Sequence, residues 1–172
     1  MRINVIGTSG SGKSTLSKQL AKKLSSPYVE LDALYWKPNW TKSNDDEFFQ
    51  QINDVVSADE WVLDGNYSRT QGIKWKRAQT VVFLDLPFHL VLWRVAVRSL
   101  VRGFKREELW AGNQETIWRH FFTRNSMIWW IMKQFHKNRK HYSVVSKKSE
   151  YSEIQFVRLR SRKEVKQFLS RV

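Results

Sequence analysis

A short run of residues near the amino terminus has the composition and spacing of a phosphate-binding loop. Two glycines with four residues between them are followed directly by Lys-Ser, which is the P-loop pattern. Glycine lets backbone N–H groups converge on phosphate oxygens, and the amino terminus of a following helix adds positive dipole character. We therefore predict that ATP binds to Gly7, Thr8, Ser9, Gly10, Ser11, Gly12, Lys13, Ser14 and Thr15.

Three of these side chains have distinct predicted roles. Lys13 would bridge the β- and γ-phosphates and act in catalysis, Ser14 would place its hydroxyl on Mg²⁺, and Thr15 would reach the α-phosphate. The alternative interpretation is a Gly/Ser-rich turn that only caps a helix. The phosphate-binding loop is favoured, because the pattern requires a strand before it and a helix after it, and the sequence predicts both.

The hydrophobic pattern defines these elements. Arg2 to Ile6 is a mainly apolar run that predicts a strand, and Leu16, Leu20 and Leu24 recur every fourth residue, as on one helix face. Further predicted strands are Tyr28 to Leu31, Trp61 to Asp64, Thr80 to Leu86 and Ile154 to Leu159. Further predicted helices are Phe48 to Val56 after the cap candidates Ser43 and Asn44, Pro87 to about Arg102, and Glu164 to Arg171.

A second motif, Val62 to Tyr67, contains an Asp-Gly pair at the end of a predicted strand. It is similar to the Asp-Gly element of adenylate kinases, which lies on the strand beside the P-loop strand. The chain thus resembles the P-loop nucleoside and nucleotide kinase superfamily. The resemblance implies that Asp64 holds the hydration shell of Mg²⁺; a turn cap is the alternative.

Other segments narrow this resemblance to one subgroup. Leu31 to Pro38, Val82 to Pro87 and Arg158 to Val165 are similar to adenylate-kinase-related proteins named topology-modulation proteins. That name describes a cellular effect and no chemistry.

Asp32 stands at the end of the second predicted strand. Related small-molecule kinases, such as shikimate kinase, carry an acidic residue there that meets the phosphoryl acceptor. The resemblance therefore implies that Asp32 is catalytic and orients the acceptor hydroxyl or accepts its proton. The alternative is a solvated helix cap. The neighbouring Tyr35, Trp36 and Trp40 would stack on an acceptor ring or pack under a flap.

Arg94, Arg98 and Arg102 recur every fourth residue and share one face of a predicted helix. In adenylate-kinase-like proteins, arginines from this helix contact the donor base and clamp the transferring phosphoryl group. The resemblance implies that Arg94 binds the nucleotide and that Arg98 and Arg102 are catalytic, tasks that suit planar guanidinium groups. A solvated basic stripe is the alternative. Arg139, in a later basic cluster, is either a second phosphate clamp or part of a surface charge run.

The strand pattern and the resemblance together predict the fold class. Apolar strands that alternate with helices indicate a parallel sheet covered on both faces. We expect an α/β protein with the three-layer P-loop kinase fold and a five-stranded parallel sheet. Residues 1–172 would form one domain, because no linker-like stretch interrupts the chain. The basic, Trp-rich segment of about 103–146, helical around Ile117 to Phe135, is predicted to be a lid-like insertion.

Composition limits the classes of function. The absence of cysteine excludes disulfides, thiol nucleophiles and thiolate zinc sites, and favours the cytoplasm. No apolar run is long enough to predict a membrane-spanning helix. The net charge of +14 favours phosphorylated or polyanionic partners. Most of this charge lies between Arg94 and Lys148, a segment that contains thirteen Lys and Arg residues and only three Glu residues.

Two functions agree with these features. The first is a phosphotransferase that uses ATP and Mg²⁺ to phosphorylate a nucleotide or another small acceptor between Asp32 and the lid. The second is an ATP-binding regulator that associates with nucleic acid through its basic segment and has little or no kinase activity. We favour the kinase, because a basic lid suits closure over two phosphorylated ligands and no nucleic-acid recognition motif is found in the sequence.

Overall fold

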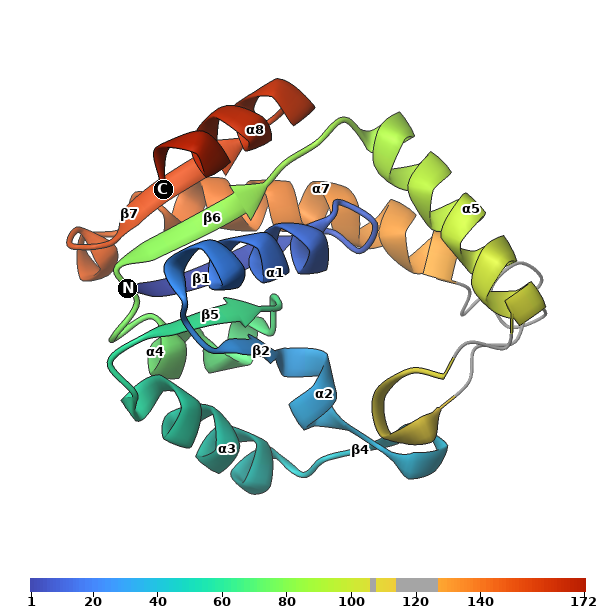
Figure 1. Cartoon of the computed structure of the whole chain (residues 1–172), viewed down its shortest axis with the longest axis horizontal. Helices are drawn as coiled ribbons and strands as arrows, with labels where there is room; N and C mark the ends of the chain where they lie inside the picture. Colours follow the sequence, from blue (N-terminus) through green and yellow to red (C-terminus); the bar gives the residue numbers. More distant parts are fainter. Residues whose placement is uncertain (106–107, 114–126) are drawn as a thin grey trace.

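The computed structural model describes residues 1–105, 108–113 and 127–172, with the side chains of residues 102–105 and 127–131 outside that description. Within these ranges the centre is a sheet of five parallel strands in the order β2-β5-β1-β6-β7 (Figure 1). The strands are β1 (Arg2–Gly7), β2 (Tyr28–Glu30), β5 (Trp61–Asp64), β6 (Thr80–Leu84) and β7 (Gln155–Leu159). Because β1 is central, the loop that follows it lies in the middle of the carboxyl edge of the sheet.

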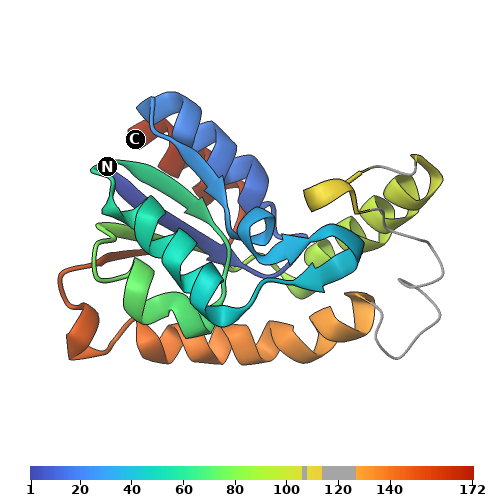
Figure 2. The same ribbon diagram turned by 90° about the horizontal axis from the view of Figure 1, so that it is seen from below.

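Helices cover both faces of the sheet and form the predicted three layers (Figure 2). The helices on one face are α1 (Lys13–Leu24) and α8 (Arg162–Arg171), and those on the other are α3 (Asp45–Ser57), α4 (Gln71–Lys74) and α7 (Met127–Val145). A further helix, α5 (Phe88–Lys105), lies across the carboxyl edge. The predicted P-loop kinase fold, with its parallel sheet, is therefore confirmed.

The ends of some elements differ from the prediction. The second strand ends at Glu30, because Leu31 begins the short helix α2 (Leu31–Tyr35). The strand predicted to reach Leu86 ends at Leu84, and Pro87, which has no N–H for a sheet bond, leads into α5. Of the two cap candidates before α3, Asn44 is the N-cap, because its Oδ1 accepts a hydrogen bond from the N–H of Glu47 at 2.7 Å.

A small antiparallel hairpin follows α2 and was not predicted. It consists of β3 (Trp36–Lys37) and β4 (Thr41–Lys42), joined by a turn in which Asn39 and Trp40 have φ angles of 58° and 55°. Strands of two residues are too short for a hydrophobic period to show in the sequence.

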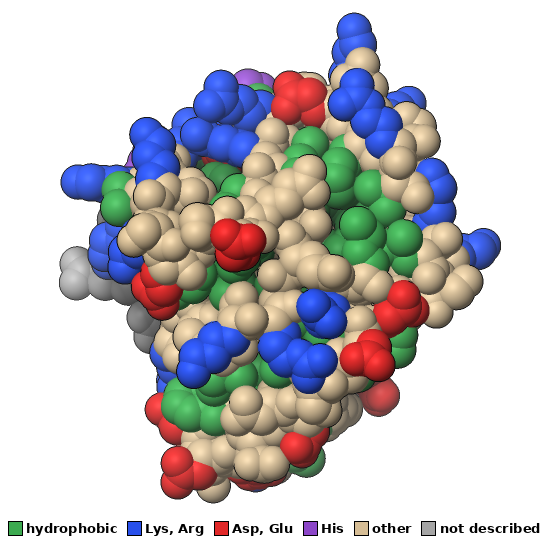
Figure 3. All heavy atoms as spheres, turned by 90° about the vertical axis from the view of Figure 1, so that its left-hand side faces the viewer, with side chains coloured by type: hydrophobic (Ala, Val, Ile, Leu, Met, Phe, Trp, Pro, Cys, Tyr) green, Lys and Arg blue, Asp and Glu red, His purple; other side chains and the backbone are tan. Residues whose placement is uncertain are grey.

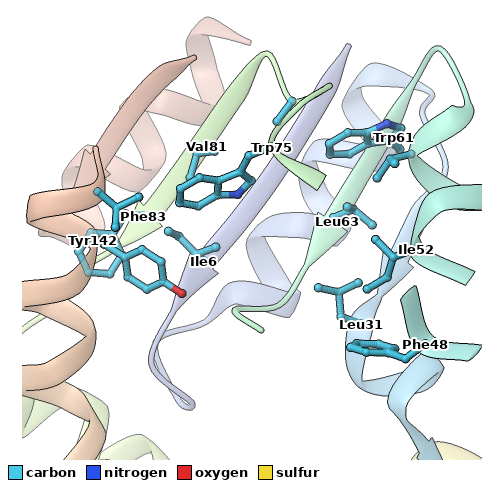
Figure 4. Close-up of a cluster of buried hydrophobic side chains, with 13 residues drawn as sticks. Ile6, Leu31, Phe48, Ile52, Trp61, Leu63, Trp75, Val81, Phe83 and Tyr142 are labelled. Atoms are coloured by element: carbon cyan, nitrogen blue, oxygen red, sulfur yellow. The ribbon is translucent and has the colours of Figure 1, made fainter. Parts of the chain in front are cut away.

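The larger hydrophobic core fixes the spacing of the strands that carry the candidate site. Ile6 on β1, Leu63 on β5 and Val81 on β6 are fully buried in one cluster, to which α3 and α7 also contribute side chains (Figure 4). Burial of each such side chain contributes roughly 1.5–3 kcal/mol to the free energy of unfolding. The same packing holds β1 beside β5, and therefore holds the loop after β1 beside the loop after β5.

The predicted insertion is only partly within the described residues. Its described elements are the end of α5, a turn at Trp110–Gly112, and α7, which continues to Val145 and thus beyond the predicted helix end at Phe135. The predicted helical residues 117–126 lie outside the described residues. None of the helices in the described ranges is long and apolar enough to span a bilayer. Figure 3 shows one face of the molecule, on which Lys and Arg side chains lie mainly along the upper left and right margins and across the middle, whereas most Asp and Glu side chains lie in the lower half.

Candidate active site

The predicted P-loop joins β1 to α1 and has a backbone that favours glycine. Gly10 and Gly12 have φ angles of 82° and 100°, in the left-handed region. A Cβ atom on Gly10 would stand 2.3 Å from Cγ2 of Val95, so the loop lies directly against α5. Gly12 is the N-cap of α1 and supplies no side-chain cap, which leaves the first N–H groups of α1 for an anion.

Helix α5 brings two of the three predicted arginines onto this loop. Arg94 donates from Nη1 to the backbone oxygen of Ser11 at 3.0 Å, and Arg98 donates from Nη2 to Oγ of Ser9 at 2.8 Å. Burial, with a smaller contribution from Arg162 at the start of α8, lowers the pKa of Arg94. The guanidinium groups of Arg94 and Arg98 are therefore held beside the backbone that is predicted to bind phosphate.

Asp64 lies at the end of β5, opposite Val5 of β1 in the sheet register. Its side chain is buried, and its Oδ2 accepts a hydrogen bond from the hydroxyl of Tyr28 at 3.3 Å. The same phenol hydrogen-bonds with the side chain of Ser14, so Tyr28 connects the two predicted metal-binding residues. Burial, followed by the charges of Asp64 and Glu30, raises the pKa of Tyr28 and keeps it protonated.

The donor atoms at this point fit a magnesium ion. Oδ1 of Asp64 is buried and has no hydrogen-bond partner among the described residues, and such a carboxylate oxygen needs a cation or a water. Among the described residues, no group of three or more acidic or histidine side chains could enclose a metal. That sparse donor set suits Mg²⁺, which keeps several waters and uses one or two protein oxygens plus substrate phosphates. Asp64 and Ser14 are thus able to hold it.

Asp32 lies in the first turn of α2, on the same edge of the sheet. Its Oδ1 accepts a hydrogen bond from the hydroxyl of Tyr67 at 2.5 Å. Burial raises the pKa of Asp32, and the Tyr67 hydrogen bond and the positive charge of Lys13 oppose that shift, as does Arg98 more weakly. The carboxylate therefore lies within electrostatic reach of the cations of the predicted nucleotide site.

A third carboxylate, Glu30, was not predicted. It ends β2, pairs in register with Asp64, and has a pKa raised by burial and by the charges of Asp64 and Asp32. A hydrogen bond from the side chain of Trp110 lowers that pKa. The sequence did not indicate Glu30 as a site residue, because its spatial neighbours Asp64 and Trp110 are distant in the chain.

The segment that contains Trp110 is fastened to the hairpin β3–β4 by one buried side chain. Asn113 accepts a hydrogen bond from the N–H of Trp40 at 2.7 Å and donates one to the backbone oxygen of Lys37 at 2.9 Å. The rings of Trp40 and Trp110 lie 6.5 Å apart in an edge-on arrangement. Trp40 therefore packs against the segment 109–113, and stacking of Trp40 on an acceptor ring stays a prediction.

Asn66 connects the loop after β5 to the P-loop. Its Oδ1 accepts a hydrogen bond from the N–H of Gly7 at 2.8 Å, and its Nδ2 donates one to the oxygen of Gly7 at 2.9 Å. Both backbone groups of the first P-loop glycine are therefore held by one side chain. The sequence contains this asparagine in the segment that resembles adenylate kinases, but no local signal gives it a partner.

Among its described side chains, the structure does not show the other two predicted arginines, Arg102 and Arg139, in contact with the P-loop. The backbone of Arg102 belongs to α5, and its side chain lies outside the described residues. Arg139 on α7 donates from Nε to Oδ1 of the buried Asp85 at 2.8 Å, and Arg158 on β7 binds Oδ2 of the same carboxylate at 2.6 Å. Arg139 therefore fastens α7 to the sheet, on the edge of an open cavity of about 590 Å³.

The sheet order and the loop between β1 and α1 define a P-loop protein with the fold of small-molecule kinases. Residues 3–111 match the AAA domain family, and the chain belongs to that family. A curated relative, "Uncharacterized protein YqaC" of Bacillus subtilis (strain 168), is 28% identical over 102 residues, which are 58% of this chain and 57% of that protein. The chain thus spans little more than half of the length of that relative.

Solved structures share the fold over nearly the whole chain. Shikimate kinase from Bacteroides thetaiotaomicron has a TM-score of 0.59 at 16% identity, covering 99% of this chain and 95% of that one. Shikimate kinase from Aquifex aeolicus has a TM-score of 0.57 at 20% identity, with coverages of 99% and 95%. A gluconokinase from Sinorhizobium meliloti has a TM-score of 0.54 at 18% identity, with coverages of 99% and 91%. At these identities the likeness establishes the fold.

Proposed function

We propose that this protein transfers the γ-phosphoryl group of ATP to a small acceptor. The position of Asp32 carries the proposal. Its carboxylate is partly buried, accepts a hydrogen bond from Tyr67, and lies close enough to Lys13 for that cation to favour its charged form. A proton acceptor that faces the P-loop lysine serves phosphoryl transfer, and nucleotide binding alone has no need of one.

The residues around the P-loop would bind and orient the donor. Lys13 and the N–H groups of the loop would hold the β- and γ-phosphates. Arg98, already bonded to Ser9 in the loop, would contact the transferring phosphoryl group, and Arg102, one helical turn further on, would join it. Arg94 would lie beside the nucleotide base. Mg²⁺, when bound through Ser14 and Asp64, would neutralise charge on the phosphates.

Asp32 would act on the acceptor. As the acceptor oxygen forms its bond to the γ-phosphorus, the bond to the β-phosphate oxygen breaks and ADP keeps the electron pair, while Asp32 takes the proton of the acceptor hydroxyl. Burial makes this carboxylate more basic than an exposed one, and the Tyr67 hydrogen bond favours its ionised form before transfer. The acceptor would be a hydroxyl compound or a nucleotide, and the shikimate kinases and the gluconokinase of the same fold support the hydroxyl compound.

A coupled assay of ADP release would test the proposal across acceptor classes: nucleosides, nucleoside monophosphates, sugars and shikimate-like alcohols. We expect at least one class to stimulate ADP release above the rate without acceptor. Lys13→Ala should abolish the stimulation and MgATP binding, whereas Lys22→Ala, on an exposed position of the same helix, should change neither. Stimulation that survives in Lys13→Ala, or no stimulation by any class, would contradict a kinase function.

A further inference from the structure

Lys74 is fully buried at the end of α4, beneath the loop that follows β5. Its Nζ donates to the backbone oxygens of Asn66 at 2.8 Å and of Gly65 at 3.3 Å. Burial is the cause that lowers the pKa of Lys74, to about 7. An apolar side chain of equal length would fill the same space without the cost of removing an amine from water. The specific contribution of lysine here is therefore its N–H donors.

These donors act on a turn that carries two parts of the candidate site. The turn begins at Asp64, whose carboxylate is the candidate metal-binding group, and it contains Asn66, whose side-chain amide holds both backbone groups of Gly7. Lys74 thus lies one hydrogen bond from the residue that secures the P-loop. Displacement of the Asn66 backbone would move the amide away from Gly7 and would turn the Asp64 carboxylate.

A second buried contact from the same helix end supports the turn. The oxygen of Gly65 also accepts a hydrogen bond from Nδ2 of Asn4 at 3.3 Å, and Oδ1 of Asn4 accepts one from Nε1 of Trp75 at 2.9 Å. Trp75 and Lys74 are neighbours, so the end of α4 holds the turn through two separate paths. Partners in such a buried network are expected to show coupled effects when they are replaced.

We propose that Lys74 is a positioning residue of the nucleotide site: through the backbone of Gly65 and Asn66, it sets where Asp64 and the P-loop stand relative to each other. The inference rests on the proposed function, because it needs MgATP as the ligand of that site. Lys74 itself touches neither the nucleotide nor the acceptor.

The test replaces Lys74 by methionine, whose unbranched apolar side chain is one heavy atom shorter and lacks the N–H donors. We expect Lys74→Met to raise the dissociation constant of MgATP, measured by calorimetry, about tenfold or more, with a matching rise in the Mg²⁺ concentration needed for binding. Ile52→Val, in the same core but on α3, is the control. It should lower the thermal midpoint without a change in MgATP affinity, which separates loss of position from loss of stability.

Asn66→Ala gives a second measurement that does not require Lys74→Met to fold. It should weaken MgATP binding to a similar extent, and the double variant should be no weaker than the worse single variant, because both act through one turn. If Lys74→Met or Asn66→Ala bound MgATP with wild-type affinity while Lys13→Ala abolished binding, this inference would be overturned. The proposed function would not be affected by that result. Absence of MgATP binding in the wild-type protein would overturn both.

Discussion

Tyr67 donates its phenol hydrogen to Oδ1 of Asp32 across 2.5 Å, and this bond acts against the effect of burial on the same carboxyl group. Burial raises the pKa of Asp32, and the hydrogen bond lowers it. Burial and the charge of Asp32 in turn raise the pKa of Tyr67, so the phenol stays a donor. The hydrogen bond therefore favours the ionised form of Asp32 in surroundings that alone would favour the neutral acid.

Tyr67→Phe should therefore move the acidic limb of the activity profile to higher pH. Without the phenol, the pKa of Asp32 rises further, so the carboxylate is protonated at pH values where the wild-type group is still a base. The measurement is kcat/KM against pH for the best acceptor. Tyr151→Phe removes a phenol from a residue near the amino end of β7 and should leave the profile unchanged. An unmoved limb in Tyr67→Phe would show that Asp32 is not the titrating base.

Asp64→Asn and Asp32→Asn should impair different steps: the first the use of Mg²⁺, the second transfer to the acceptor. Asp64→Asn should raise the Mg²⁺ concentration needed for half-maximal turnover, because an amide binds a hydrated cation less well than a carboxylate. Asp32→Asn should leave MgATP binding nearly unchanged and lower transfer by a factor on the order of 10²–10⁴. Magnesium titrations and acceptor saturation curves on both variants make the comparison. Equal damage to nucleotide binding would assign both carboxylates to the metal.

The buried lysine predicts how stability depends on pH. Burial lowers the pKa of Lys74 from its ordinary value of 10.5 to about 7, so between these values the unfolded chain holds a proton that the folded protein has released. The free energy of unfolding should therefore rise with pH through this window, by up to about 1.4 kcal/mol per pH unit. Urea unfolding at a series of pH values would measure the slope. Lys74→Met should remove it, and an equal slope in both proteins would contradict the prediction.

The basic surface predicts a weak and salt-sensitive attraction to nucleic acid. With a net charge of +14, the protein should bind DNA without sequence preference at low salt and lose most of that affinity as salt reaches physiological concentration. Fluorescence anisotropy with two unrelated DNA duplexes across a salt series would measure it. A sequence-preferring complex that survives ~200 mM salt would favour the nucleic-acid-associated regulator over the kinase.

The sequence was sufficient for features that depend on local order. The P-loop is contiguous, and Gly12, the second glycine of the pattern, has a left-handed backbone that favours glycine. The parallel sheet followed from apolar strands alternating with helices, and the structure confirms it. The roles given to Asp32 and Asp64 came from resemblance; the structure brings both to the same sheet edge as Lys13, and their roles stay predictions.

The rest of the site depends on contacts between residues that are far apart in the chain. Asn66 meets Gly7 only because β5 pairs with β1, and Trp110 meets Glu30 only because the segment 109–113 packs beside α2 and the hairpin β3–β4. Lys74 stands in a four-residue helix whose sequence resembles any exposed basic turn, so neither its burial nor its partners could be inferred. Such contacts depend on which strands pair and how helices pack, and a local sequence pattern predicts neither.

Asn113 has a consequence for how molecules enter and leave the acceptor side. One buried amide ties the hairpin of residues 36–42 to the segment 109–113, so neither can swing outward while the other remains in place. Movement of one away from the other would break at least one of the two hydrogen bonds of that amide. Exchange of the acceptor and exposure of the Glu30–Trp110 bond to solvent would then be coupled, with the Asn113 amide among the contacts that oppose both.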